Sequence, residues 1–118
     1  MEKVTIWHNP RCSKSRESIS IADENSADTE IFKYLDETPG VDELKNVFKM
    51  LGFTSVREWM RTKEDIYKEL NLKEEIDEEK LFEAMAQNPK LIERPVLIKN
   101  GKAIIGRPTS IIADFLKS

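Results

Sequence analysis

The sequence predicts a single α/β domain with a mixed four-stranded sheet, in the element order β-α-β, a helical segment, then β-β-α. Three observations support this prediction. Runs of β-branched and aromatic residues stand near both ends of the chain, an Asn-Gly pair joins two such runs, and amphipathic helical patterns fill the middle. At 118 residues the chain can bury one core but not two ordinary ones. We therefore expect one domain, residues 1–118, with a helical insertion at about residues 41–88.

The first third of the chain has a β-α-β pattern. Residues Val4–Trp7 form a β-branched and aromatic run that predicts a strand. Either Cys12 or Ser13 can then cap a helix, which we expect to reach about Asn25. The sequence "TEIFKYL", residues 29–35, predicts a second strand.

The acidic middle of the chain has helical periodicity. "VDELKNVFKML" predicts a helix that stops at Gly52, and "DEEKLFEAMAQ" predicts another that ends before Pro89. The apolar residues expected to face the core are Val41, Leu44, Val47, Phe48 and Leu51 in the first helix and Leu81, Phe82, Met85 and Ala86 in the second.

The last third predicts a β-hairpin followed by a helix. "PVLIKNGKAIIG" places two apolar runs on either side of Asn100-Gly101. An Asn-Gly pair suits a two-residue hairpin turn because both turn positions need a positive φ. The final helix is expected to begin near Thr109 or Ser110.

This element order is that of a thioredoxin-type domain with helices inserted in its middle. In such a layout the first strand is central, and its C-terminal end faces the loop that enters the third strand. Cys12 would then lie near Arg94 and Pro95. The Arg94-Pro95 bond is a candidate for the cis isomer, which would hold the Arg94 backbone beside the cysteine.

The charge distribution favours an anion site over nucleic-acid binding. The net charge is −3, yet residues 1–16 and residues 91–118 each carry +3, whereas residues 17–90 carry −9. An acidic chain is a poor nucleic-acid ligand, but a fold that joins the two basic ends would create an anion site. The alternative is that most of these charges simply solvate the surface.

Several classes of protein are disfavoured. The apolar runs are much shorter than the roughly 18 residues that a membrane helix needs, and the N-terminus has no leader-type apolar segment. One cysteine cannot form an internal disulfide, and one Cys with one His falls short of a zinc ligand set. We expect a cytoplasmic monomer without a metal.

Cys12 is the only cysteine, and its surroundings predict a reactive thiol. It is expected at a helix N-terminus, where the helix dipole and free N–H groups stabilise a thiolate, with Arg11, Lys14 and Arg16 close in sequence. The alternative is an inert, buried cysteine that acts as a small apolar residue. Because Ser15 replaces the second cysteine of a Cys-x-x-Cys pair, a redox cycle needs an external thiol, and Ser15 could hydrogen-bond the sulfur.

Other polar residues are candidates for the same site. His8 could stabilise the thiolate or merely cap a turn. Arg94 and Arg107 each precede a proline at a strand end, and planar guanidinium groups suit bidentate binding of a tetrahedral oxyanion. Arg61 is a third candidate, although the pattern does not separate it from Arg57.

Four stretches of the sequence together resemble the glutaredoxin-coupled arsenate reductase family, which has the thioredoxin fold. They are "HNPRCSKSR", "WMRTKEDIYKELNL", "NPKLIERPVLI" and "IIGRPTSI", in family order and at family-like spacing. The resemblance implies glutathione as co-substrate and glutaredoxin as partner. The site residues that it implies are Cys12 as nucleophile, His8 and Ser15 as groups that favour its thiolate, Arg61, Arg94 and Arg107 as arsenate-binding arginines, and Pro95 as the cis-proline.

The implied reaction reduces arsenate to arsenite through a covalent adduct on Cys12, which glutathione and glutaredoxin then resolve. Two other functions fit the same chain. The related Spx-type regulators share the fold and bind RNA polymerase, but many of them carry a Cys-x-x-Cys pair that this chain lacks. A glutathione-dependent thiol reductase would use Cys12 without needing three converging arginines.

Overall fold

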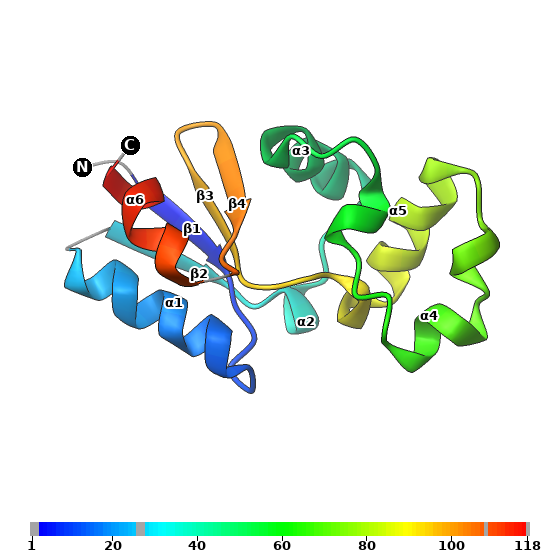
Figure 1. The fold of residues 1–118 in the computed structure, drawn as a ribbon, viewed down its shortest axis with the longest axis horizontal. Helices are drawn as coiled ribbons and strands as arrows, with labels where there is room; N and C mark the ends of the chain where they lie inside the picture. Colours follow the sequence, from blue (N-terminus) through cyan, green and yellow to red (C-terminus); the bar gives the residue numbers. More distant parts are fainter. Residues whose placement is uncertain (1–2, 26–27, 108, 118) are drawn as a thin grey trace. The chain divides into compact units, whose positions relative to one another are not determined.

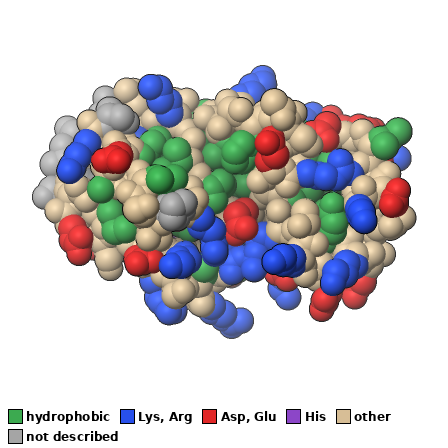
Figure 2. All heavy atoms as spheres, viewed as in Figure 1, with side chains coloured by type: hydrophobic (Ala, Val, Ile, Leu, Met, Phe, Trp, Pro, Cys, Tyr) green, Lys and Arg blue, Asp and Glu red, His purple; other side chains and the backbone are tan. Residues whose placement is uncertain are grey.

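The structure is a computed structural model that describes residues 3–25, 28–107 and 109–117. Contacts between backbone segments divide the chain into two units. A sheet unit comprises Met1–Glu37 and Arg94–Ser118, and a helical unit comprises Thr38–Glu93. Figure 1 shows the path of the chain through both units, and Figure 2 shows both acidic and basic side chains on the face in view.

The sheet unit contains four strands in the spatial order β2-β1-β3-β4. Their bounds are β1 Lys3–Trp7, β2 Asp28–Phe32, β3 Val96–Lys99 and β4 Lys102–Ile105. Strand β1 is parallel to β2 and antiparallel to β3, which is antiparallel to β4. The predicted fold class is thereby confirmed as a thioredoxin-like α/β fold with a mixed sheet, and β1 lies between two neighbours as expected.

Local turn chemistry shapes the ends of the strands. The β3–β4 hairpin turns at Asn100 and Gly101, which have φ values of 54° and 76°, as the Asn-Gly pair predicts. The prediction for the second strand was too long, because β2 ends at Phe32 and Tyr34–Glu37 forms the short helix α2. The chain turns there because Tyr34 is buried and stacks on Trp7 with ring centroids 6.3 Å apart.

Two helices cover the same face of the sheet in Figure 1: α1, Ser13–Glu24, and α6, Ile112–Lys117. The one-turn 3₁₀ helix η4, Thr109–Ile111, precedes α6, while Pro108 lies outside the described residues. The core between these helices and the sheet is formed by Val4, Ile6, Ala22, Leu97, Ile112 and Leu116. Burial of alternate residues of β1 thus fixes which face of the strand receives α1.

The helical unit consists of short helices joined by loops. Its elements are α3 Val41–Leu51, η1 Val56–Trp59, α4 Asp65–Glu69, η2 Leu72–Glu74, α5 Glu78–Gln87 and η3 Pro89–Leu91. Helix α3 ends at Leu51, and Gly52 is its C-cap residue, with a φ of 75° in the left-handed region. Phe48 and Phe82 form an edge-to-face pair with ring centroids 5.4 Å apart. Leu81, Phe82 and Met85 of α5 are buried, as predicted. The small residue buried with them is Ala84, whereas the predicted Ala86 is only half-buried.

Polar contacts connect the short elements of the helical unit. The side chain of Glu78 accepts hydrogen bonds from the Val56 backbone N–H at 2.8 Å and from the Ser55 hydroxyl at 3.2 Å. Asp77 caps α5 by accepting a hydrogen bond from the Glu79 N–H at 3.0 Å. Among the described residues, no helix combines the length and apolar composition needed to cross a membrane.

Candidate active site

A tight loop after β1 places Cys12 at the start of α1. The His8 N–H donates to the Phe32 carbonyl at 2.9 Å, which extends the β1–β2 pairing by one residue. Asn9 then folds the loop back, because its side-chain oxygen accepts the Arg11 N–H and its carbonyl accepts the Cys12 N–H, both at 3.0 Å.

Cys12 is the N-cap residue of α1. Its backbone is extended, and its carbonyl accepts the Arg16 N–H at 3.0 Å, which begins the helical hydrogen bonding. The side chain makes no capping hydrogen bond and is 8% exposed. The thiol is therefore buried, as the inert alternative requires, but its neighbours are polar.

The electrostatic surroundings favour the thiolate. Burial raises the pKa of the Cys12 thiol, but hydrogen bonds from the backbone N–H groups of Ser15 and Lys14 and the charges of Arg94 and Arg107 outweigh it. The net result is a pKa below the ordinary value of a cysteine. A lowered pKa raises the fraction of the nucleophilic form near neutral pH.

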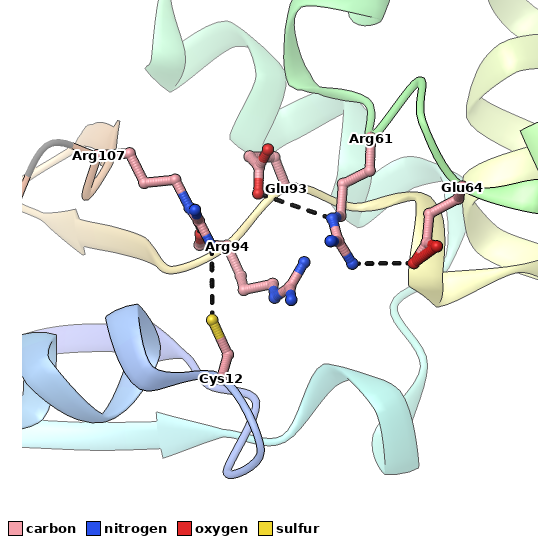
Figure 3. A network of polar contacts seen from close by, with 6 residues as sticks. All are labelled: Cys12, Arg61, Glu64, Glu93, Arg94 and Arg107. Atoms are coloured by element: carbon pink, nitrogen blue, oxygen red, sulfur yellow. Dashed lines mark hydrogen bonds and ion pairs between the residues drawn. The ribbon is translucent and has the colours of Figure 1, made fainter.

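Two arginines distant in sequence influence the sulfur: Arg107 contacts it, as Figure 3 shows, and Arg94 acts through its charge. Arg107 donates from Nη2 to the Cys12 Sγ at 3.4 Å and from Nε to the Arg94 carbonyl at 2.7 Å. The peptide bond between Arg94 and Pro95 is cis, and the Pro95 carbonyl accepts the Gly106 N–H at 2.9 Å. The entrance of β3 and the exit of β4 thus position both arginines.

Two of the basic side chains close to Cys12 in sequence, those of Lys14 and Arg16, have other partners. Arg11 is exposed, Lys14 Nζ lies 3.7 Å from a Glu17 carboxylate oxygen, and Arg16 Nη1 donates to the Pro10 carbonyl at 3.0 Å. None of these three side-chain charges is among the causes of the lowered Cys12 pKa. Lys14 instead contributes its backbone N–H.

His8 and Ser15 form a buried pair beneath the loop. His8 Nδ1 lies 2.7 Å from Ser15 Oγ, which also accepts the Asn9 N–H at 2.9 Å. Burial, followed by the positive charges of Lys33 and Arg16, lowers the pKa of His8. The imidazole is therefore favoured in its neutral form, and the Ser15 group that acts on the sulfur is the backbone N–H rather than the hydroxyl.

The structure gives Arg57 and Arg61 different surroundings within the helical unit. Arg57 Nη2 donates to the carbonyls of Leu72, Lys73 and Glu75, so it connects η1 with η2 and the residue that follows. The Arg57 side chain therefore stabilises the backbone of the helical unit.

Arg61 contacts carboxylates instead. Its Nη1 donates to Glu64 Oε1 at 2.9 Å, and its Nε lies 3.9 Å from Glu93 Oε1 (Figure 3). Its backbone N–H donates to the Leu91 carbonyl at 2.7 Å. Sequence reasoning overlooked both glutamates. The Arg-x-x-Glu spacing could have indicated Glu64, but no local pattern indicates a contact with Glu93.

Over the part of the chain that the structure describes, no group of three or more His, Cys, Asp or Glu side chains could hold a metal ion.

The fold and the arginine-flanked thiol define a thioredoxin-like thiol protein. The chain belongs to the ArsC family, whose model matches residues 7–115.

Comparisons with known proteins cover nearly the whole chain. Arsenate reductase of Neisseria meningitidis serogroup A is 48% identical over 117 residues, which cover 98% of this chain and 100% of that one. The uncharacterized protein YfgD of Escherichia coli K12 is 47% identical over 116 residues, 98% of each chain. The structure of arsenate reductase from Vibrio cholerae has a TM-score of 0.94, 45% identity and 98% coverage of each chain.

Proposed function

We propose that this protein reduces arsenate to arsenite, with Cys12 as nucleophile and with glutathione and glutaredoxin as the source of electrons. The observation that carries the proposal is the 3.4 Å contact between Arg107 Nη2 and Cys12 Sγ. It places a permanent cation, which can bind an oxyanion, directly beside a thiol whose pKa is lowered. The arsenate reductases that resemble this chain over nearly its full length support the same substrate.

Binding of arsenate beside a thiolate requires compensation of negative charge. Arg94 and Arg107 supply two cations, and the N–H groups of Lys14 and Ser15 that act on the sulfur can also stabilise an oxyanion at the start of α1. We assign the third arsenate-binding arginine to Arg61, on the family resemblance of the sequence around it. His8 acts indirectly, because it holds the Ser15 side chain beneath the loop.

The chemistry needs three steps. The Cys12 thiolate attacks arsenic, so an S–As bond forms while one As–O bond breaks and the oxygen leaves as water after protonation. A glutathione thiolate then attacks the Cys12 sulfur, an S–S bond forms, and the electron pair of the S–As bond stays on arsenic, which leaves as arsenite. A glutaredoxin thiolate finally attacks the glutathione sulfur of the mixed disulfide and releases the Cys12 thiolate.

The external reductant follows from the cysteine count. Cys12 is the only cysteine of the sequence, so no thiol of this chain can resolve the adduct. Glutathione and glutaredoxin are the cytoplasmic pair that the family resemblance implies, and we expect the protein to act on them as a monomer.

The test is arsenate-dependent consumption of NADPH in the presence of glutathione, glutathione reductase and glutaredoxin. We expect turnover by the wild type, none by Cys12→Ser, and none when either glutathione or glutaredoxin is omitted. Turnover that persists in Cys12→Ser would refute the mechanism. A glutathione-dependent thiol reductase would instead reduce a disulfide substrate without arsenate turnover and would retain that activity in Arg94→Ala.

A further inference from the structure

Two carboxylates hold the side chain of Arg61. The Nη1–Glu64 hydrogen bond of 2.9 Å and the Nε–Glu93 ion pair of 3.9 Å are both drawn in Figure 3. The three side chains have similar exposure, 31% for Arg61, 30% for Glu64 and 29% for Glu93, so solvent screens these pairs only in part. We call this group of three residues the Arg61 clamp.

The net charge of the Arg61 clamp disfavours binding of an anionic ligand. One guanidinium and two carboxylates sum to −1 when all three are ionised, so an oxyanion that approaches Arg61 also meets two like charges. The three side chains line one hollow of about 320 Å³ in the helical unit, together with Met60, Thr62 and Lys63. Lys63 adds one positive charge to this lining, so the hollow as a whole is neutral, and a ligand that enters it meets Arg61 together with its two carboxylate partners.

The clamp also occupies nitrogens that an oxyanion would use. A guanidinium can bind two oxygens at once along its Nε–Nη2 edge or its Nη1–Nη2 edge. In Arg61 the first edge includes the nitrogen beside Glu93, and the second includes the nitrogen that donates to Glu64. An oxyanion that binds two nitrogens of either edge therefore competes with Glu64 or Glu93 for one of those nitrogens.

We propose that Glu64 and Glu93 set the oxyanion affinity of this protein by competing with the ligand for Arg61. The inference rests on the proposed function, since it assumes that Arg61 binds the oxyanion. An oxyanion exchanges with one carboxylate of the clamp when it binds, and the displaced carboxylate remains as a nearby like charge. The clamp accordingly lowers affinity, and neutralising either glutamate tightens oxyanion binding.

The test measures binding of sulfate, a tetrahedral dianion that the thiol does not reduce, by isothermal titration calorimetry at low ionic strength. We expect Glu64→Gln and Glu93→Gln each to bind sulfate about two- to fivefold more tightly than the wild type, the range that corresponds to a partly exposed ion pair. Glu83→Gln is the matched control, because it removes one exposed charge from α5 in the same unit outside the clamp. Its sulfate affinity should match that of the wild type.

A double variant tests whether Arg61 transmits the effect. In an Arg61→Gln background, Glu64→Gln should tighten sulfate binding by a clearly smaller factor than in the wild type, since the contested guanidinium is gone and only like-charge repulsion is relieved. Circular dichroism and urea unfolding establish that each variant is folded.

Three outcomes overturn the proposal: unchanged or weaker sulfate binding in both single variants, an equal gain in Glu83→Gln, or no sulfate binding by any of these proteins. Arsenate turnover assayed on the same proteins separates the two claims. Cys12-dependent turnover with unchanged sulfate affinity refutes the clamp alone. Tighter sulfate binding without arsenate turnover supports the clamp and refutes the reductase.

Discussion

Arg107 donates a hydrogen bond to the sulfur of Cys12 across 95 residues of sequence, at 3.4 Å. The same guanidinium donates to the Arg94 carbonyl at 2.7 Å, so the backbone next to the cis bond directs the cation toward the thiol. Activation of Cys12 therefore depends on the pairing of β1, β3 and β4 as well as on the helix that Cys12 caps.

Replacement of Arg107 by alanine should weaken both thiol activation and catalysis. Loss of the guanidinium charge raises the pKa of Cys12, because one of the causes that lower it is removed. Arsenate turnover should fall about a hundredfold, as is typical when an oxyanion-binding donor is removed. The pH dependence of iodoacetamide alkylation reports the thiol pKa. As a control, Arg11→Ala removes the same charge from an exposed side chain and should leave the alkylation profile unchanged. Identical profiles for Arg107→Ala and the wild type would contradict a role of Arg107 in lowering the thiol pKa.

Replacement of Ser15 by alanine should destabilise the protein. Ser15 is fully buried, and its hydroxyl is the partner of both His8 Nδ1 and the Asn9 N–H. Leaving these groups unsatisfied should lower the free energy of unfolding by about 1–3 kcal/mol. Urea denaturation measures the change. Ser13→Ala, at an exposed position of the same helix, should cost much less, and equal losses in the two variants would count against the buried pair.

His8 should make stability depend on pH below neutrality. Burial, then the charges of Lys33 and Arg16, lower its pKa in the folded protein from 6.5, so folding favours the neutral imidazole. As pH falls below 6.5, the unfolded chain takes up the proton first and the free energy of unfolding decreases; above 6.5 the contribution is fully present.

The measurement compares urea midpoints at about pH 7.5 and about pH 5.5, a window above the ordinary carboxyl range. The stability advantage of the wild type over His8→Asn, which cannot titrate, should shrink at the lower pH. An advantage that grows on acidification would show that folding favours the imidazolium.

Gly106 should not tolerate a larger residue. A Cβ at this position would lie 2.9 Å from Ile112 Cδ1, 3.0 Å from Pro95 Cγ and 3.1 Å from Leu97 Cδ1. Gly106→Ala should therefore lower the free energy of unfolding by about 1–3 kcal/mol through overpacking. Gly40→Ala is the control, since nothing lies within 4 Å of its added Cβ, and it should change stability by no more than about 0.5 kcal/mol. Equal midpoints for the two variants in thermal or urea unfolding would contradict this packing.

The sequence by itself determined the features that depend on local chemistry. The Asn100-Gly101 turn, the C-cap of α3 at Gly52 and a helix that begins next to Cys12 follow from backbone preferences and apolar periodicity, which act over a few residues. The position of the thiol at a helix N-terminus was predictable for the same reason.

Only the tertiary structure decided which groups reach that thiol. Lys14 and Arg16 are near in sequence, yet their side chains contact Glu17 and the Pro10 carbonyl, whereas strand pairing brings Arg107 to the sulfur. The early end of β2 likewise depended on burial of Tyr34. Side-chain contacts between distant segments depend on packing, so a local sequence pattern does not predict the direction in which a guanidinium points.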